Sequence, residues 1–340
     1  MQTMILGRTG LVVTKPAFGA LPIQRRSKED AAAILRRAYE GGIRYFDTAN
    51  SYTDSEEKIG LALSDVRRDI VISTKSQGRD YETVKTHIAL SLERMKTDYI
   101  DLFQFHLAGR WEDIDRGAWD AAMEAKEAGL VRHVGVTAHS LRFAFELAES
   151  DRFETLQYPF SYLSNDEERR LVALCREKNI GYIAMKSLAG GLLSNARAVH
   201  AFMREQENVV PIYGVQTMEE LEEWLALAAE DPVLDADLRA VIEKDRAELG
   251  GQFCRSCGYC MPCPQGIEIR NCARMDMLIR RSPWRPYFTP EWQAKMAKIE
   301  DCVECGRCKS RCPYGLDTPK VLKYMLKDYR EFYDAHKDEL

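Results

Sequence analysis

The densest group of reactive side chains in this 340-residue sequence is a pair of cysteine runs near its end. Eight of the ten cysteines fall in two segments, residues 254–263 with the spacing C-x2-C-x2-C-x2-C and residues 302–312 with the spacing C-x2-C-x2-C-x3-C, each followed by proline. The second spacing equals the bacterial ferredoxin pattern, in which three thiolates hold one [4Fe–4S] cluster and the fourth holds the other. The runs therefore predict two [4Fe–4S] clusters with exchanged fourth ligands.

The first run departs from the ferredoxin spacing by one residue before its last cysteine. Zinc is the alternative, but a zinc site takes four ligands from two C-x2-C pairs, whereas each run here carries four by itself. Cys175 and Cys272 lie outside the runs and are expected to be small buried hydrophobic residues. The predicted ligands are Cys254, Cys257, Cys260 and Cys312 for one cluster, and Cys302, Cys305, Cys308 and Cys263 for the other.

A second reactive group lies in the first third of the chain, where polar residues close short apolar runs. Asp47, Lys75 and His106 each end or follow such a run, and Tyr52 comes soon after Asp47. A tyrosine can protonate a carbonyl oxygen as hydride reaches the carbon, provided that a nearby cation lowers its pKa. Lys75, held by Asp47, is predicted to be that cation, and His106 to donate a hydrogen bond to the same oxygen. Singly, these residue types are more often structural, so the prediction depends on the set.

The elements that must position this set alternate between strands and helices. Up to about residue 230, short β-branched and aromatic runs alternate with amphipathic segments, which is typical of repeated βα units. Helices are predicted at Lys28–Glu40, Tyr81–Met95, Gly117–Ala128 and Asp166–Lys178. The eight predicted strands are Pro16–Ala20, Gly42–Phe46, Asp69–Ser73, Tyr99–Phe105, Val131–Val136, Thr155–Tyr158, Gly181–Met185 and Val209–Gly214.

Eight parallel strands favour a closed (β/α)₈ TIM barrel over an open sheet, although strand order alone permits both. The carboxyl ends of barrel strands form the catalytic face, so the polar residues that close these strands are expected to converge. Residues 1–230 are predicted to form the barrel, 231–251 a helical linker with a hinge at Gly250-Gly251, and 252–340 a small, mainly α-helical, ferredoxin-like iron–sulfur domain. The opening segment, Leu6–Val13, is expected to form a hairpin that plugs the barrel bottom.

Composition narrows the class of partner. The formal charge is -5 and the pI about 5.8, with acidic and basic residues interspersed, which argues against nucleic-acid and anionic-membrane surfaces. The sequence shows neither a secretion signal nor an apolar run of membrane-spanning length. We therefore expect a cytoplasmic, reducing location, and a small-molecule substrate. The final Lys337–Leu340 copies an endoplasmic-reticulum retention signal, which acts only on proteins already in the secretory lumen.

The barrel motifs resemble those of the aldo/keto reductase family. The cysteine-rich segment at residues 252–340 resembles the iron–sulfur branch of that family, so the resemblance spans the whole chain. The family implies reduction of aldehydes and ketones with NADPH or NADH, and its tetrad matches Asp47, Tyr52, Lys75 and His106. The residues that carry the resemblance are Leu6-Gly7-Arg8-Thr9-Gly10-Leu11, Phe46-Asp47-Thr48-Ala49, Ser51-Tyr52-Thr53-Asp54-Ser55-Glu56, Ser73-Thr74-Lys75, Phe105-His106 and Cys257–Pro264.

The cofactor side departs from the family pattern. Ala138 replaces the Asn expected at the carboxamide, Met185 the stacking Tyr, Gln216 the Arg that clamps the 2′-phosphate, and Trp224 the Asn at adenine. Loss of the cationic clamp weakens discrimination for NADPH, so that NADH is equally expected. The nucleotide contacts that the resemblance implies are Asp47, Thr137, Gln157, Met185, Lys186, Leu188, Gly214, Gln216, Glu220 and Glu223.

The sequence therefore predicts a nicotinamide-dependent carbonyl reductase or alcohol dehydrogenase, of subclass EC 1.1.1, acting on a small carbonyl or alcohol substrate. A hydride carries two electrons, whereas a cubane cluster passes one, so the clusters are either structural or serve a ferredoxin-like electron partner. The rival hypothesis is cluster-driven one-electron reduction or elimination on a substrate held by the tetrad, without nicotinamide. A third is a non-enzymatic electron-transfer module, which the complete tetrad argues against.

Overall fold

The computed structural model describes residues 1–249, 253–256, 258–281, 284–312 and 314–339, so the predicted Gly250-Gly251 hinge lies outside the described residues. The chain divides into two compact units. Unit 1 comprises Met1–Ser187 and Asn195–Ile242, and unit 2 comprises Leu188–Ser194 and Glu243–Leu340. No helix among the described residues is both long and apolar enough to cross a membrane.

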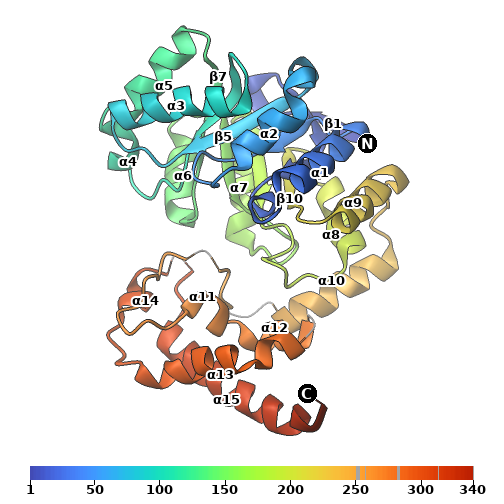
Figure 1. The fold of residues 1–340 in the computed structure, drawn as a ribbon, viewed down its shortest axis with the longest axis vertical. Coiled ribbons are helices and arrows are strands. Elements are labelled where there is room, and N and C mark those ends of the chain that lie inside the picture. Colours follow the sequence, from blue (N-terminus) through green and yellow to red (C-terminus); the bar gives the residue numbers. More distant parts are fainter. Residues whose placement is uncertain (250–252, 257, 282–283, 313, 340) are drawn as a thin grey trace. The chain divides into compact units, whose positions relative to one another are not determined.

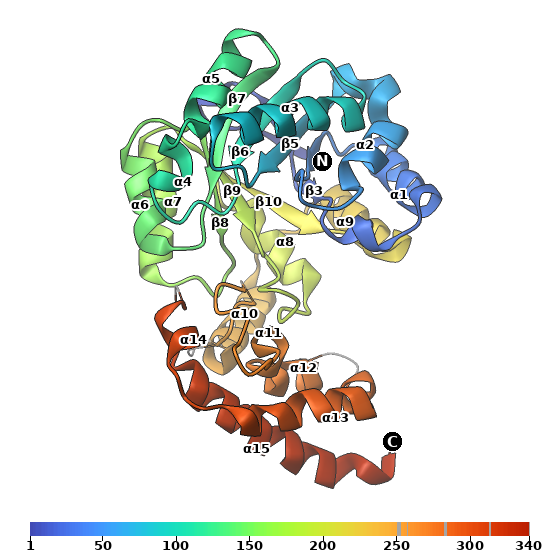
Figure 2. The ribbon, with the colours of Figure 1, turned by 60° about the vertical axis from the view of Figure 1, so that its left-hand side comes forward.

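Unit 1 is a closed barrel of eight parallel strands surrounded by helices (Figures 1 and 2). Each strand pairs with its neighbours along the chain, and the last strand, β10, pairs with the first barrel strand, β3. The predicted (β/α)₈ architecture is therefore confirmed. The barrel strands are β3 (Ala17–Gly19), β4 (Tyr45–Asp47), β5 (Val71–Ser76), β6 (Ile100–Phe105), β7 (Val131–Thr137), β8 (Thr155–Pro159), β9 (Gly181–Met185) and β10 (Val209–Gly214).

The barrel helices begin where capping residues precede amphipathic segments. Ser27 and Asp80 accept hydrogen bonds from the first turns of α1 and α3, and Asn165 and Thr217 form capping boxes with α7 and α9. The helices are α1 (Lys28–Glu40), α2 (Ser55–Leu63), α3 (Tyr81–Met95), α4 (Glu112–Asp115), α5 (Ala118–Glu127), α6 (Leu141–Glu149), α7 (Asp166–Glu177), α8 (Ala196–Arg204) and α9 (Met218–Glu230).

A hairpin closes the amino-terminal end of the barrel, as predicted. Strands β1 (Gln2–Ile5) and β2 (Val12–Lys15) pair antiparallel, and between them Leu6 is buried in a cluster with core residues of the barrel. Gly7 has a φ of +53°, and a Cβ there would lie 2.1 Å from the backbone nitrogen of Gly181, where β9 starts. Glycine is required by both the conformation and the close approach.

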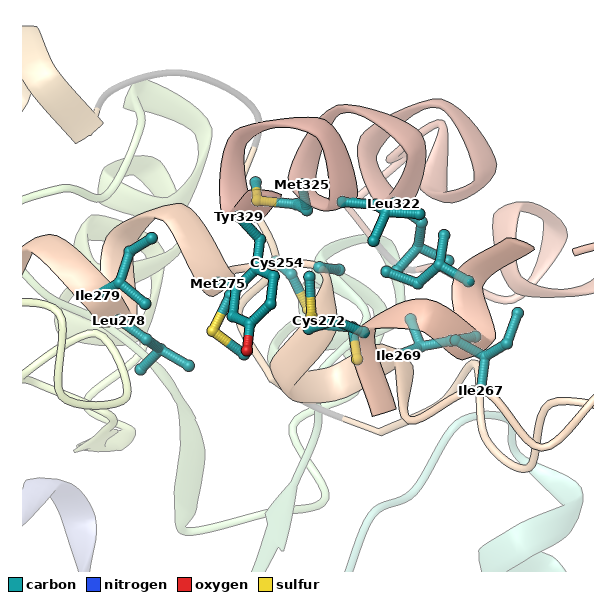
Figure 3. Packing of buried hydrophobic residues seen from close by; sticks show 14 of the residues in the cluster. Cys254, Ile267, Ile269, Cys272, Met275, Leu278, Ile279, Leu322, Met325 and Tyr329 are labelled. Atoms are coloured by element: carbon teal, nitrogen blue, oxygen red, sulfur yellow. The ribbon is translucent and has the colours of Figure 1, made fainter. Parts of the chain in front are cut away.

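Unit 2 is mainly helical, as predicted. Its apolar core lies between the last helix and the short helices before it, and Figure 3 shows Cys254, Cys272 and Met275 among the side chains of that core. The ring of Phe288 stacks on Tyr329 with centroids 4.7 Å apart. Its helices are the end of α10 (Ala236–Leu249), α11 (Ile269–Cys272), α12 (Met275–Arg281), α13 (Pro290–Ala297), α14 (Arg307–Ser310) and α15 (Thr318–His336).

Candidate active site

A buried ion pair lies at the carboxyl end of the barrel strands. Asp47 is the last residue of β4, and Lys75 lies in the adjacent strand β5. Lys75 Nζ donates to Asp47 Oδ2 at 2.6 Å and to the carbonyl oxygen of Thr48 at 2.5 Å, and only 1% of its side chain is exposed. The other carboxylate oxygen of Asp47 accepts from Ser73 Oγ at 2.6 Å. The strand pairing thus places the predicted cation and its counter-ion in direct contact.

Tyr52 lies beside this ion pair, in the loop between β4 and α2. Lys75 Nζ is 5.3 Å from the centroid of its ring. Burial raises the pKa of Tyr52, while the charge of Lys75 lowers it and that of Asp47 raises it, with a raised pKa as the net result. Lys75 does lower the pKa of the Tyr52 phenol, as predicted, but burial raises that pKa by more. Tyr52 remains a protonated phenol at neutral pH, the form that an acid requires.

His106 also lies beside the Tyr52 ring. The two rings are nearly perpendicular, with centroids 5.8 Å apart, and Ser51 Oγ is 3.5 Å from His106 Nδ1. Burial, followed by the charge of Lys75, lowers the pKa of His106 to about 2. The imidazole is therefore neutral at physiological pH. This contact is compatible with either tautomer. When Ser51 donates to Nδ1, the imidazole proton lies on Nε2, from which it can be donated to a carbonyl oxygen.

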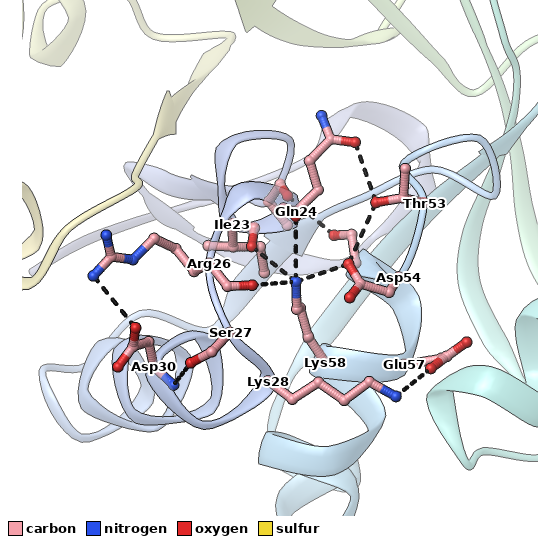
Figure 4. A network of polar contacts seen from close by, with 12 residues as sticks. Ile23, Gln24, Arg26, Ser27, Lys28, Asp30, Thr53, Asp54, Glu57 and Lys58 are labelled. Atoms are coloured by element: carbon pink, nitrogen blue, oxygen red, sulfur yellow. Dashed lines mark hydrogen bonds and ion pairs between the residues drawn. The ribbon is translucent and has the colours of Figure 1, made fainter.

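The loop that carries Tyr52 is held by Lys58 of α2, which sequence reasoning missed. Lys58 Nζ donates to the carbonyl oxygens of Arg26 at 2.8 Å and Ile23 at 3.1 Å and to Asp54 Oδ1 at 2.7 Å (Figure 4). Only 1% of the Lys58 side chain is exposed. The network joins the segment after β3 to the Tyr52 loop. The sole sequence signal is Asp54 four residues before Lys58, because the carbonyl oxygens belong to a distant segment.

Arg79 holds the segment that carries His106, and it was likewise missed from sequence. Its Nη2 donates to the carbonyl oxygens of His106 at 2.8 Å and Leu107 at 3.2 Å, while the backbone nitrogen of His106 donates to Ser76 at 2.8 Å. The junction after β6 is thus fixed from both sides, which orients the imidazole.

Two further predicted residues lie in adjacent strands of the barrel. Thr137 closes β7 and pairs in register with Gln157 of β8. Thr137 Oγ1 accepts from the backbone nitrogen of Leu107 at 2.8 Å, and Gln157 Oε1 accepts from Gln104 Nε2 at 3.0 Å. Met185 is the last residue of β9 and is partly exposed. These groups fit one face of a nicotinamide ring, since they offer polar partners and a soft apolar side chain near the tetrad.

In unit 2, the predicted cluster ligands line two cavities. One is lined by all four cysteines of a predicted set, Cys302, Cys305, Cys308 and Cys263, and also by Cys260. The other is lined by Cys254, Cys260 and Cys312 of the second set, whose Cys257 lies outside the described residues. The last cysteine of each run therefore lines the cavity that the other run surrounds. This donor set fits a cluster, because thiolates are the ligands that iron–sulfur clusters take.

The remaining cysteines differ in character. Cys175 and Cys272 are fully buried, and burial raises the pKa of both to about 12, which confirms them as neutral, apolar packing residues. Among the described residues, no three His, Cys, Asp or Glu side chains converge as a single metal ion requires. A cubane differs from an ion in this respect, since its ligands bind separate corners.

Comparison with known proteins identifies both units. Residues 17–233, more than half of the chain, match the model of the aldo/keto reductase family, and residues 253–317 match the model of a 4Fe-4S dicluster domain. The chain belongs to the aldo/keto reductase family. It carries a 4Fe-4S dicluster domain after the reductase domain.

Relatives of this aldo/keto reductase include oxidoreductases from bacteria and plants. It is 31% identical over 208 residues to the uncharacterized oxidoreductase YqkF of Bacillus subtilis, covering 57% of this chain and 67% of that protein. It is 31% identical over 221 residues to L-galactose dehydrogenase of Arabidopsis thaliana, with the same coverage. The fold is similar to that of aldo-keto reductase AKR11C1 from Bacillus halodurans, with a TM-score of 0.65, 23% identity, and coverage of 72% of this chain and 96% of that chain.

This aldo/keto reductase departs from expectation at the segment after β10. Trp224, which replaces the Asn that the family pattern places at the adenine, is only 5% exposed and stacks on Tyr213 with ring centroids 3.8 Å apart, which is a packing role. Glu220 accepts from the backbone nitrogens of Gln216 and Thr217 as the capping residue of α9. Gly214 ends β10, and Glu223 is exposed on α9.

A cation nevertheless lies beside position 216. Arg25 Nη1 donates to Gln216 Oε1 at 3.4 Å, although the two residues are far apart in sequence. This chain lacks the guanidinium that the family pattern places at position 216, but Arg25, from the segment after β3, brings one next to it, which no local motif predicts.

The loop after β9 also differs from expectation. Met185 and Lys186 belong to unit 1, and Lys186 has a φ of +59°, whereas Leu188, a predicted nucleotide contact, belongs to unit 2. In unit 2, Arg274 Nη2 donates to the carbonyl oxygen of Gly190 at 2.6 Å. Arg274 is a buried guanidinium, and sequence reasoning did not single it out.

Proposed function

We propose that this aldo/keto reductase interconverts a small carbonyl compound and the corresponding alcohol with NADH or NADPH, and that Tyr52 is the general acid and base. The observation that carries the proposal is the buried Lys75–Asp47 ion pair beside the Tyr52 ring, with the neutral imidazole of His106 in contact with the same ring. This is the donor arrangement that stabilises negative charge developing on a carbonyl oxygen.

In the direction of reduction, Tyr52 gives its phenol proton to the carbonyl oxygen. The ammonium of Lys75 then stabilises the phenolate that remains, and Asp47 keeps that ammonium in place. His106 donates from Nε2 to the same oxygen and orients the substrate. In the reverse direction, the Tyr52 phenolate removes the alcohol proton, so the raised pKa of Tyr52 favours reduction over oxidation at neutral pH.

Thr137, Gln157 and Met185 would hold the nicotinamide, which supplies or accepts the hydride when it is bound. The other contacts carried over from the family are those of Asp47, Lys186, Leu188 and Gly214. Around the adenosine phosphate, Gln216 offers an amide in place of the clamping arginine, and Arg25 lies next to it. Both NADH and NADPH are therefore candidate cofactors. Glu220 and Glu223 remain candidates, although the capping bonds already engage Glu220.

We further propose that unit 2 holds two [4Fe–4S] clusters. One is bound by Cys254, Cys257, Cys260 and Cys312, and the other by Cys302, Cys305, Cys308 and Cys263. The two cysteine-lined cavities support this assignment. Because hydride transfer moves two electrons and a cluster one, we assign the clusters a structural role in a domain whose apolar core is small. A ferredoxin-like electron partner is the alternative use of the clusters.

The proposal is tested by nucleotide oxidation in the presence of a panel of aldehydes and ketones. Tyr52→Phe removes the transferable proton and is expected to lower kcat about 10²- to 10⁴-fold, as loss of general acid catalysis does. Tyr81→Phe is the matched control, because Tyr81 of α3 makes an exposed hydrogen bond to Glu124 of α5, and its loss is expected to leave kcat unchanged. Equal activity of Tyr52→Phe and the native protein would remove Tyr52 from the mechanism.

A further inference from the structure

A chain of buried hydrogen bonds crosses the barrel interior beside the tetrad. Gln104 of β6 is fully buried, and its Nε2 donates to Gln157 Oε1 at 3.0 Å and lies 3.5 Å from Asp47 Oδ1. The same oxygen of Asp47 accepts from Ser73 Oγ at 2.6 Å, and Ser73 Oγ accepts from the Tyr45 hydroxyl at 3.1 Å. Barrel interiors are usually filled by branched apolar residues, so this polar chain calls for a function.

Gln104 carries a cost that an apolar residue of its size would not. Its Oε1 is buried and has no hydrogen-bond partner among the described residues. A buried acceptor without a partner is unfavourable, and methionine would fill the same space without that penalty. Packing alone therefore does not explain a glutamine at this position. The explanation lies in what its amide donor does.

The direction of the chain is set by Asp47. An ionised carboxylate only accepts hydrogen bonds, and Asp47 is paired with Lys75, so the amide nitrogen of Gln104 must face it. The same nitrogen donates to Gln157 Oε1, which leaves the Gln157 amide nitrogen as the group free to contact a ligand. Reversal of either amide would bring two oxygens together.

We infer that Gln104 is a positioning residue, which fixes the amide of Gln157 so that Gln157 recognises the nicotinamide carboxamide through the carbonyl oxygen of that group. The inference rests on the proposed function, in which Gln157 contacts the nicotinamide. It extends that function, because it links the tetrad residue Asp47 to cofactor orientation and gives the Gln157 contact a direction. The amino group of the carboxamide is then recognised elsewhere.

The test is a binding cycle measured by fluorescence titration of cluster-loaded protein. Gln104→Met is expected to weaken the binding of NADH and NADPH about fivefold to tenfold, the usual effect of losing one oriented hydrogen bond. On a Gln157→Met background the same substitution is expected to have no effect, because Gln104 acts through Gln157. Thr155→Val is the matched control, since Thr155 Oγ1 is buried in the same interior without a hydrogen-bond partner among the described residues.

A cofactor analogue tests the direction of the contact. In 3-acetylpyridine adenine dinucleotide an acetyl group replaces the carboxamide, which keeps the carbonyl oxygen and removes the amino group. Gln157→Met is expected to weaken the binding of NAD⁺ and of this analogue by the same factor. If Gln104→Met does not fold, Gln104→Glu replaces it in the test. Its acceptor turns the Gln157 amide around, and NAD⁺ is then expected to bind several-fold tighter than the analogue.

The outcomes separate this inference from the proposed function. Native protein that binds neither NADH nor NADPH overturns both. Native protein that binds a nucleotide, together with equal binding by Gln104→Met, overturns the inference alone. The inference is also overturned if Gln104→Met lowers nucleotide affinity equally in the native and the Gln157→Met backgrounds. It is overturned as well if Gln157→Met weakens the binding of NAD⁺ but not that of the analogue. Thermal unfolding of each variant checks that its fold is intact.

Discussion

The two units of this chain position their reactive residues by different means. In unit 1, strand pairing fixes the backbone of Asp47 and Lys75, and buried hydrogen bonds fix their side chains. In unit 2, the candidate ligands lie mostly in loops, and among the described ones Cys305 is exposed and most of the others are partly exposed. The ion pair of the barrel is thus held by hydrogen bonds of the chain itself, whereas the proposed clusters would hold the cysteine loops of unit 2 together. On this proposal the comparison teaches that a cofactor can be a guest in one unit and part of the scaffold in the other.

Removal of iron is expected to produce the largest difference in behaviour between the two units. Because metal-ligand bonds contribute folding free energy, on the order of 10 kcal/mol in structural metal sites, anaerobic chelation should open the loops at residues 254–263 and 302–312. Amide hydrogen exchange should rise there and in α15 while it stays low in the barrel strands. Equal protection in both units after iron loss would contradict a scaffolding role for the clusters.

Within the barrel, loss of the hydrogen bonds of Lys58 should reduce stability the most. Lys58→Met leaves two carbonyl oxygens and the Asp54 carboxylate without their donor, so we expect about 3 kcal/mol of lost stability and roughly tenfold lower kcat, since the Tyr52 loop loosens. Lys28→Met is the control. Its ion pair with Glu57 is exposed and should contribute less than about 1 kcal/mol. Urea unfolding measures the loss of stability in each variant, and an equal loss in both would contradict this account.

Acid should weaken the barrel through its buried neutral histidines. Burial lowers the pKa of His106 to about 2 and, with the charge of Lys186, that of His139 to about 3. The unfolded chain binds these protons below about pH 6.5, whereas the folded chain does not, so stability falls as pH decreases. Each histidine should contribute roughly 2 kcal/mol of loss between pH 6.5 and 5. His139→Gln should show a smaller loss in urea unfolding, and an unchanged pH slope would contradict this burial effect.

Arg274 extends the comparison to electrostatics in unit 2. Burial lowers its pKa, and the nearby Cys254 thiolate raises it, so a buried positive charge lies beside one candidate cluster. Arg274→Gln should lower the midpoint potential of that cluster by an amount on the order of tens of millivolts, because the reduced cluster carries more negative charge. Arg270→Gln is the control, since Arg270 is exposed and its charge is screened. A redox titration followed by electron paramagnetic resonance should show a larger shift for Arg274→Gln.

The smallest expected effect concerns the barrel rim. Gln216→Arg restores the cation of the family pattern and should favour NADPH over NADH by about tenfold, as a charge-assisted contact does. Arg25→Ala should lower the ratio of NADPH affinity to NADH affinity by about threefold, because exposed ion pairs are weak. Arg36→Ala, which removes an ion pair with Asp65, controls for surface charge. Unchanged preference in Arg25→Ala would remove Arg25 from phosphate recognition.

Sequence was most informative where an interaction follows from spacing. Strands β9 and β10 and helices α1 and α3 match their predicted bounds, because hydrophobic period and capping residues are local signals. The predicted strand ends likewise brought Asp47 and Lys75 into contact.

Sequence failed where partners are remote. Lys58 and Gln104 contact groups brought near only by the closed barrel, and Arg25 reaches Gln216 from another loop. The packing of Trp224 was not predicted, because alignment to a motif does not reveal that its ring stacks on Tyr213. The pKa of Tyr52 depends on how deeply the folded loop buries it, which spacing does not encode.

The central claim is hydride chemistry at the tetrad, and nucleotide binding tests it most directly. Anaerobically purified protein, with its iron and sulfide content measured, is titrated separately with NADH and NADPH by fluorescence. The account predicts micromolar affinity for at least one nucleotide, as the family resemblance and the groups at Thr137 and Gln157 imply. Binding of neither would contradict it and favour one-electron chemistry in which the clusters act on a substrate held by the tetrad.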